Sequence, residues 1–342
     1  MPPRATVSCV KRLYLIALAP LIFAAAVLRA PAPARAGFGD LVDAVRDRLD
    51  SVLIAYDVLA APATEVELRA SLRTGLRLEG IEGKRLQFLR GEELLGEVKT
   101  DEDGNAAIPW TVPDEPGDYL FTVRAHPDDQ PKRPAPDAEL LVAARKADAK
   151  LLVTDLDKTV VASGFFRVLT GGAEPMPGAA AVLERLAPDH TVIYLTHRPD
   201  VLGPTSKRWL AENGFPRGPL LASTLSGFLG GSGRYKTDRL NALHTEFKNI
   251  VAGIGDKLSD ARAYADNGVA SILILDVDWS EDEPEDYDRL ADDLAALPDA
   301  VQVVTNWTQI ADVLLKGAHF PKADMEKRLR DTASDLRRRP TD

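Results

Sequence analysis

Apolar and polar residues alternate along the first half of the chain, whereas the second half carries unbroken apolar runs. In the alternating part, segments such as "VELRASL", "RLQFL" and "YLFTV" have period two, and turn signals such as Asp103-Gly104 separate them. Short segments of this period and spacing predict the strands of a β-sandwich. We therefore expect an all-β domain over residues 54–146. Its acids lie in turns and its aromatic residues fit a core, so binding or positioning is its expected role.

From about residue 147 the apolar runs "LLVT", "TVIYLT", "IVAGIG", "SILILD" and "VQVVT" have strand length. The segments between them, such as "GAAAVLERLA" and "YKTDRLNALHTEF", have the pattern of helices. Continuous apolar strands that alternate with helices predict an α/β domain, here residues 147–320, with a parallel sheet covered on both faces. In such sheets ligands bind outside the carboxyl ends of the strands. Residues 321–342 are expected to form a solvated helical tail.

The N-terminal residues have the pattern of an export signal. Basic residues precede the apolar run "LYLIALAPLIFAAAVL", and "APARA" follows with the small residues that a signal peptidase cuts after. We expect a signal peptide over residues 1–36, cleavage before Gly37, and a periplasmic or secreted protein. The alternative is an uncleaved membrane anchor, but the run is shorter than the roughly 20 residues that span a bilayer. No stable membrane span is expected after cleavage.

Residues 37–53 are expected to form one amphipathic helix, because Leu41, Val45, Leu49 and Val52 recur at a spacing of three to four. Packing on the following domain is the simpler role. Binding to a membrane surface is the alternative, although the polar face is mostly acidic.

Composition places the chain among folded globular proteins of more than one domain. It has 342 residues, 45% of them hydrophobic, and a net charge of −10. Removal of residues 1–36 takes away five basic residues and no acidic one, which leaves 37 basic against 52 acidic residues and a net charge of −15. Nucleic acid is therefore not an expected partner. The single cysteine, Cys9, lies in the removed segment, so the mature chain has no disulfide.

Polar residues gather where three of the predicted parallel strands end. Asp155 and Asp157 follow the first strand, Thr196 ends the second, and Asp256 and Asp260 follow the third. A helix that runs antiparallel to the strands begins at this same edge, and its first turns carry one lysine. The lysine that can reach the carboxylates is Lys236.

Several carboxylates at one edge would repel one another and raise their own pKa values unless a cation shared them. A hard divalent ion with oxygen ligands, here Mg²⁺, resolves this crowding. A lysine and a threonine beside the metal suit a phosphoryl group, and an aspartate can act as the nucleophile. The set therefore predicts phosphoryl-transfer chemistry.

These motifs resemble those of the haloacid dehalogenase (HAD) superfamily of phosphatases, over about residues 148–318. "DLDKT" is similar to the first motif, Thr196 to the second, Lys236 to the third and "GDKLSD" to the fourth. The resemblance implies that Asp155 is the nucleophile and a Mg²⁺ ligand. It implies that Asp157 binds the metal through its carbonyl and acts as general acid and then base. Thr196 and Lys236 would hold phosphoryl oxygens, and Asp256 and Asp260 would complete the metal site.

A closer resemblance is to the catalytic domains of lipins and actin-patch phosphatidate phosphatases. It rests on "YLTHRPDVLGPTSKRWLAENGFPRGPLLAS" and "GDKLSDARAYADNGV", and the preceding domain resembles an immunoglobulin-like sandwich. The resemblance implies a HAD-like Rossmannoid sheet, a phosphatidate-like lipid phosphate as substrate, and a membrane surface as its source. Lys158 departs from the glycine or aspartate usual in the family. Arg198 matches a lipin arginine and is expected either to contact the phosphate or to be an exposed residue that caps the next helix.

The gaps between the motifs leave no room for a cap domain. Asp157 and Thr196, and likewise Thr196 and Lys236, are only about forty residues apart, and ordinary helix and loop fill these gaps. A site without a cap is open to bulky or surface-held substrates. Two alternatives stay open: a phosphatase for another phosphomonoester, such as a phosphoprotein or nucleotide, and a non-catalytic module that binds lipid phosphates.

Overall fold

The computed structural model describes residues 51–74, 79–130, 135–163, 172–224, 232–280 and 283–338. The expected signal peptide and nearly all of the expected amphipathic helix lie outside these ranges. The residues from Ser51 onward form one compact unit. Its first strand, β1, begins at Val52, so the expected helix boundary at residue 53 is wrong by two residues. Within the described ranges, no helix has the length and apolar character needed to cross a membrane.

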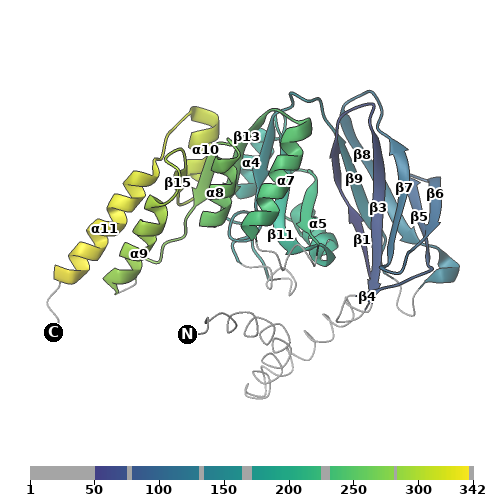
Figure 1. Cartoon of the computed structure of the whole chain (residues 1–342), viewed down its shortest axis with the longest axis horizontal. Coiled ribbons are helices and arrows are strands. Elements are labelled where there is room, and N and C mark those ends of the chain that lie inside the picture. The colour runs from purple at the N-terminus through teal and green to yellow at the C-terminus, as the bar shows by residue number, and fades with distance from the viewer. Residues whose placement is uncertain are drawn as a thin grey trace, which may run out of the picture. The chain divides into compact units, whose positions relative to one another are not determined.

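The N-terminal domain consists of two β-sheets that share one hydrophobic core (Figure 1). The expected strands are confirmed as β3, β5 and β8, and Leu68, Leu72, Phe88 and Phe121 fill the core. One sheet has the order β1-β3-β4, with β7 also paired to β3, and the other has the order β2-β9-β8-β5-β6. The strands are β1 (Val52–Tyr56), β2 (Val58–Ala60), β3 (Glu65–Thr74), β4 (Glu79–Gly80), β5 (Arg85–Arg90), β6 (Glu93–Lys99), β7 (Asn105–Thr111), β8 (Gly117–Ala125) and β9 (Ala138–Ala144). The immunoglobulin-like assignment stays a prediction.

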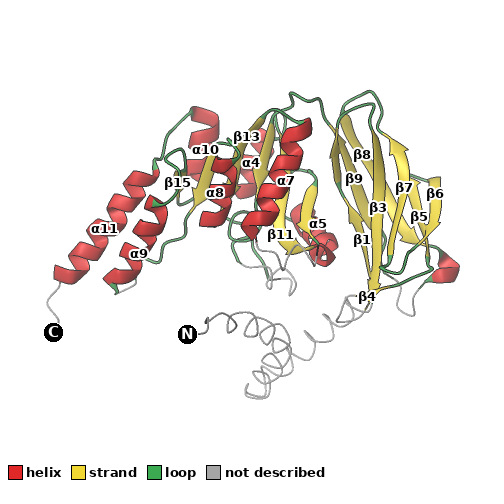
Figure 2. Ribbon diagram, viewed as in Figure 1, coloured by secondary structure: helices red, strands yellow, loops and turns green. Residues whose placement is uncertain are grey.

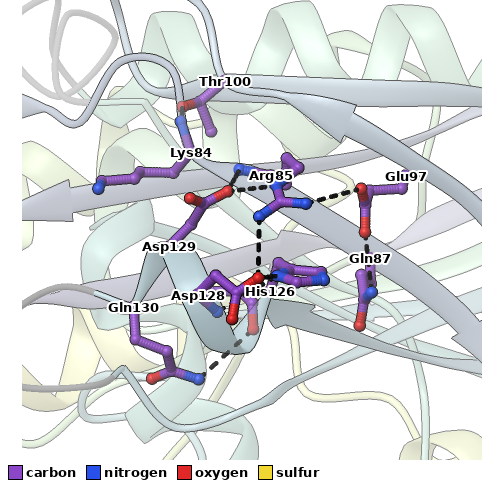
Figure 3. A network of polar contacts seen from close by, with 10 residues as sticks. Lys84, Arg85, Gln87, Glu97, Thr100, His126, Asp128, Asp129 and Gln130 are labelled. Carbon is purple, nitrogen blue, oxygen red and sulfur yellow. Dashed lines mark hydrogen bonds and ion pairs between the residues drawn. The ribbon is translucent and has the colours of Figure 1, made fainter.

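A polar network fastens the short helix η1 (Pro127–Asp129) to the rim of this domain (Figure 3). Arg85 on β5 donates from Nε to Asp129 Oδ2 at 2.6 Å, and its other guanidinium nitrogens lie 3.6 Å from Asp128 and 3.9 Å from Glu97. The Arg85 contact lowers the pKa of Asp129. All these groups hold one another at the surface, so the network is structural.

The second domain is a six-stranded parallel sheet with the order β12-β11-β10-β13-β14-β15. The five expected apolar runs are all strands, and β12 is a sixth that the sequence analysis missed. The strands are β10 (Leu151–Thr154), β11 (Thr191–Pro199), β12 (Leu220–Ser223), β13 (Ile250–Gly255), β14 (Ser271–Ile274) and β15 (Gln302–Val304). Alternate residues of β10 face opposite layers, because Leu152 belongs to one core cluster while Leu151 and Val153 belong to another.

Helices cover both faces of this sheet, as expected (Figure 2). One face packs against α4 (Ala179–Leu186), α5 (Gly203–Glu212) and α10 (Trp307–Lys316). The other packs against α7 (Ser232–Glu246), α8 (Leu258–Asp266) and α9 (Pro284–Ala295). The absence of a cap domain stays a prediction, because residues 164–171 and 225–231 are outside the described ranges.

The expected solvated tail is instead an integral helix. Helix α11 (Lys322–Arg338) packs against α9 and buries Met325, Leu329 and Ala333 in the core that α9 shares with the sheet. These three residues recur every four positions, so they form one apolar stripe on an otherwise charged helix. The tail therefore belongs to the α/β domain.

A buried ion pair joins the two domains. Asp57, between β1 and β2, accepts hydrogen bonds from the backbone N–H groups of Leu141 (2.8 Å) and Leu220 (2.9 Å). Lys207 on α5 lies 2.6 Å from the same carboxylate, and its Nζ also donates to the carbonyls of Ala55 and Glu139. The Asp57 side chain is 2% exposed, so its charge depends on Lys207 for compensation.

Lys207→Met is expected to lower the free energy of unfolding by about 3 kcal/mol, because it leaves the Asp57 carboxylate buried without a counter-charge. Denaturant unfolding measures the change. Lys316→Met is the matched control, since Lys316 makes an exposed ion pair with Asp312 and its loss is expected to change stability by less than about 0.5 kcal/mol. Equal effects of the two substitutions would contradict a buried pair at Asp57.

Candidate active site

The loop after β10 brings its acids to the carboxyl edge of the sheet. Asp155 still continues the ladder, since its N–H donates to the Ile254 carbonyl at 2.9 Å. The chain then turns tightly around Leu156, whose carbonyl accepts the N–H groups of Thr159, Val160 and Val161. Lys158, at the tip of this turn, has a φ of 55°. That conformation is strained for a side chain with a Cβ, which explains why glycine suits this position.

Lys236 lies at the centre of the acidic cluster, as expected. It is on α7, it is fully buried, and its Nζ lies 2.6 Å from Asp260 Oδ2 and 3.1 Å from Asp155 Oδ2. Asp155, Asp256 and Asp260 each bring an oxygen atom within 4.8 Å of those of the other two. The structure therefore brings together four of the predicted site residues, two from the ends of strands β10 and β13 and two from helices α7 and α8.

The electrostatics of the cluster are those of crowded acids around one cation. Burial alone would lower the pKa of Lys236, but Asp155 and Asp260 raise it, so the ammonium stays charged. Burial and then the nearby Asp155 carboxylate raise the pKa of Asp256 to about 7. Burial likewise raises the pKa of Asp260, against the opposing effect of Lys236.

The donor set fits a hard divalent cation. Three carboxylates opposed by one ammonium leave a formal charge of −2, which a divalent ion would neutralise. Asp256 Oδ1 is buried and has no hydrogen-bond partner among the described residues. Such an oxygen is disfavoured unless something binds it.

Gly255 allows the fourth-motif acid to come this close. A Cβ at Gly255 would lie 2.8 Å from Asp260 Cβ and 3.0 Å from its Oδ2. Any larger residue would therefore push Asp260 away from Lys236 and Asp155.

Asp157 is held by Arg198, an arrangement that sequence analysis did not foresee. Arg198 Nη2 donates to Asp157 Oδ1 at 2.6 Å and Nε donates to Oδ2 at 2.9 Å, so the pair is bidentate. Arg198 is 4% exposed, so the expectation of an exposed helix-capping residue is wrong. Ser206 on α5 accepts from Arg198 Nη1 at 2.9 Å. No sequence signal identified Ser206, because its role depends on where α5 packs.

Thr196 lies buried on β11, two residues before Arg198. Its Oγ1 accepts the backbone N–H of Arg198 at 3.2 Å, so the hydroxyl already shapes the chain at this point. Its role as a phosphoryl ligand stays a prediction, as do the catalytic roles of Asp155 and Asp157.

A cavity of about 930 Å³ lies between the sandwich and α7, away from the acids. Its lining includes Arg69 and Glu67 from β3 and Arg239 and Glu246 from α7, but none of the clustered carboxylates. The clustered acids and the cavity therefore lie in different parts of the molecule. We assign the candidate active site to the acidic cluster, because its carboxylates and its ammonium group can hold a divalent cation and a phosphoryl group.

Comparison with known proteins identifies part of the second domain. Residues 152–278 match the family model described as the LNS2 domain of PITM 1-3, a lipin-like domain with a HAD-like phosphatase fold. The matched segment contains all the predicted site residues. The expected lipin-like resemblance is therefore confirmed for these residues, and it supports a phosphatase. No curated protein matches the chain.

Similarity to solved structures is weak. A chain of the Pnkp1/Rnl/Hen1 RNA repair complex is 15% identical with a TM-score of 0.35, over 40% of this chain and 46% of that one. A HAD-like phosphatase from Mesorhizobium loti is 14% identical with a TM-score of 0.34, over 64% of this chain and 95% of that one. The D0-D1 domain of intimin is 17% identical with a TM-score of 0.19, over 27% and 49%. Scores this low assign neither fold nor function, and this chain spans about half of the RNA repair chain.

Lys158→Gly is expected to raise the free energy of unfolding by about 0.5–1 kcal/mol, because relief of the positive φ outweighs the extra freedom of glycine in the unfolded chain. The matched control is Lys327→Gly, at an exposed lysine inside helix α11, where glycine costs about 1 kcal/mol relative to a good helix former. This control is expected to lose stability. Loss of stability in both variants would contradict strain at Lys158.

Mg²⁺ is expected to raise the melting temperature by about 5–10 °C at a hundredfold excess over its dissociation constant. Asp256→Asn removes a carboxylate ligand and is expected to abolish this shift. Asp266→Asn, an exposed site at the end of α8, is expected to retain it. Thermal unfolding with and without Mg²⁺ measures both, and an equal shift in the two variants would contradict the assigned metal site.

Proposed function

We propose that this chain is a Mg²⁺-dependent phosphatase that hydrolyses a phosphatidate-like lipid phosphomonoester through an aspartyl-phosphate on Asp155. The observation that carries the proposal is the buried contact of Lys236 with Asp155 and Asp260, beside Asp256, inside the segment that matches a lipin-like domain. Crowded carboxylates with one ammonium suit the transfer of an anionic phosphoryl group.

Asp155, Asp256 and Asp260 would hold the Mg²⁺ through carboxylate oxygens, and Asp157 through its backbone carbonyl. The ion would supply charge neutralisation for the phosphoryl oxygens. Lys236 would supply a second positive charge beside Asp155. Its contact at 3.1 Å also limits the rotation of the attacking carboxylate.

In the first half-reaction an oxygen of Asp155 forms a bond to phosphorus while the bond from phosphorus to the lipid oxygen breaks. The lipid oxygen leaves with the electron pair and takes a proton from Asp157, which gives the neutral lipid. A protonated carboxyl group has one oxygen fewer to accept hydrogen bonds. One of the two Arg198 contacts with Asp157 must therefore loosen when Asp157 carries this proton.

In the second half-reaction a water oxygen attacks phosphorus and the bond to Asp155 breaks. The water proton passes to Asp157, which restores the acid, and inorganic phosphate leaves. Asp157 is a charged carboxylate only between the two half-reactions, after it has given its proton to the lipid oxygen, and in that state both of its oxygens can accept from Arg198.

The resemblance to lipins supports a lipid substrate, and two exposed lysines support an anionic one. Lys158 and Lys257 each directly follow a site acid and are exposed at the same edge of the sheet. They add positive charge beside the acidic cluster, where an anionic substrate would approach. We propose that the substrate is presented by a membrane surface and that the protein is exported to meet it.

Phosphate release tests the proposal. The mature chain, from residue 37 onward, is expected to release phosphate from phosphatidate in micelles only when Mg²⁺ is present. Asp155→Asn is expected to abolish release because the nucleophile is lost. Asp157→Asn is expected to lower kcat by at least a hundredfold while Mg²⁺ still stabilises the protein, because only proton transfer is removed.

Soluble phosphomonoesters in parallel reactions separate the alternatives. Release confined to soluble esters would retain the catalytic assignments and exclude the lipid. If the chain releases phosphate from no ester but still binds phosphatidate vesicles, it is a binding module and not an enzyme.

A further inference from the structure

The sandwich reaches the segment that carries Arg198. The Tyr56 hydroxyl, at the end of β1, donates to Asp200 Oδ2 at 2.8 Å. Burial and then the Asp200 carboxylate raise the pKa of Tyr56 to about 12, so the hydroxyl keeps its proton and remains a donor. Asp200 is 3% exposed, and its other oxygen accepts the Val201 N–H at 2.9 Å. Asp200 is only two residues beyond Arg198.

The sandwich also holds the other end of this segment. Lys207 contacts Asp57 and two sandwich carbonyls, and it directly follows Ser206, the residue that accepts from Arg198 Nη1. Residues 198–207 are thus fastened to the sandwich at Asp200 and at Lys207. The arginine that holds Asp157 lies two residues before the first of these points, and Ser206, whose hydroxyl accepts from that arginine, lies one residue before the second.

We propose that the sandwich is part of the catalytic unit, in which Tyr56 is a positioning residue that acts through Asp200 and Arg198 on Asp157. The inference rests on the proposed function, because Asp157 is its proton donor. Proton transfer requires the donor to lie within hydrogen-bond reach of the leaving oxygen, and small displacements slow it strongly. Arg198 lies near the end of β11, where the pairing with β12 is irregular between Thr196 and Pro199, and the 3₁₀ turn η2 (Asp200–Leu202) leads from there into α5. Contacts to this turn and to α5 therefore influence where the Arg198 side chain lies.

At the domain junction β1 packs against α5 and against the 3₁₀ turn η2, and a cavity lies beside these contacts. It separates β3 from α7 over about 930 Å³, and Tyr56 and Asp57 lie at its border. Phenylalanine at position 56 keeps the packing of the ring but cannot donate to Asp200 Oδ2. The effect of a change at Tyr56 should consequently pass to Asp200 rather than be absorbed by neighbours.

Tyr56→Phe removes only the hydroxyl. We expect its kcat on phosphatidate with Mg²⁺ to fall about tenfold and KM to change by less than about twofold. Tyr119→Phe is the matched control, because the Tyr119 hydroxyl donates to the Glu115 carbonyl within the sandwich and has no hydrogen bond to any described residue of the α/β domain. It is expected to match the wild type. Asp200→Asn keeps the shape of the other partner and is expected to resemble Tyr56→Phe.

The Arg198→Lys background tests the route. If Tyr56 acts through Arg198, then Tyr56→Phe lowers kcat in the wild-type chain but has no further effect when Arg198 is already replaced. A loss of general folding stability would instead lower activity equally in both backgrounds. That equal loss would overturn the proposal.

A second readout does not need turnover. The Nε–H of Arg198 donates to Asp157, and its proton–nitrogen resonance, assigned by its loss in Arg198→Lys, reports that contact. Tyr56→Phe is expected to shift this resonance toward the position of solvent-exposed arginines, whereas Tyr119→Phe leaves it in place. If the wild-type chain hydrolyses no phosphomonoester, the proposed function fails. The resonance still tests whether Tyr56 positions Arg198 against Asp157. An unchanged resonance in both Tyr56→Phe and Asp200→Asn would overturn the inference.

Discussion

The candidate active site depends on one buried ammonium group. Lys236 offsets the repulsion among Asp155, Asp256 and Asp260, and it opposes the rise that burial causes in the pKa values of Asp256 and Asp260. A neutral Asp155 would be a poor nucleophile, and neutral ligands would bind a divalent cation weakly. Because Lys236 is fully buried, its charge in turn depends on the acids. The four groups are therefore stable only as a set, and their net charge matches the ion they are suited to hold.

The parallel sheet brings this set together from distant parts of the sequence. Asp155 and Asp256 follow the adjacent strands β10 and β13, while Lys236 and Asp260 come from helices that begin at the same edge. Two backbone features sharpen the arrangement. Gly255 leaves space for Asp260, and the turn around the Leu156 carbonyl carries Asp157 over to Arg198.

Sequence reasoning reached the acids and Lys236 because strand ends and helix beginnings share an edge in any parallel α/β sheet. It missed β12, whose four residues follow a proline- and glycine-containing segment and give too short an apolar run. It read α11 as solvated because charges dominate its composition, although Met325, Leu329 and Ala333 already showed a buried stripe. The pairing of Arg198 with Asp157 was not accessible, since it depends on a turn that places residues 41 positions apart in contact. The positive φ of Lys158 was likewise not predicted, because only a glycine at that position would have indicated it.

The two outer strands of the parallel sheet are both short, and each has a backbone amide that is already occupied. On β12 the Leu220 N–H is taken by Asp57 of the sandwich, and on β15 the Val303 N–H is taken by the carbonyl of Phe320, just before α11. Free strand edges are templates for pairing between molecules. The sandwich and the C-terminal segment therefore also protect the two edges of the sheet from pairing with other molecules. An isolated α/β domain cut at residue 147 would expose the β12 edge together with an unpaired Lys207, and self-association would be its characteristic failure.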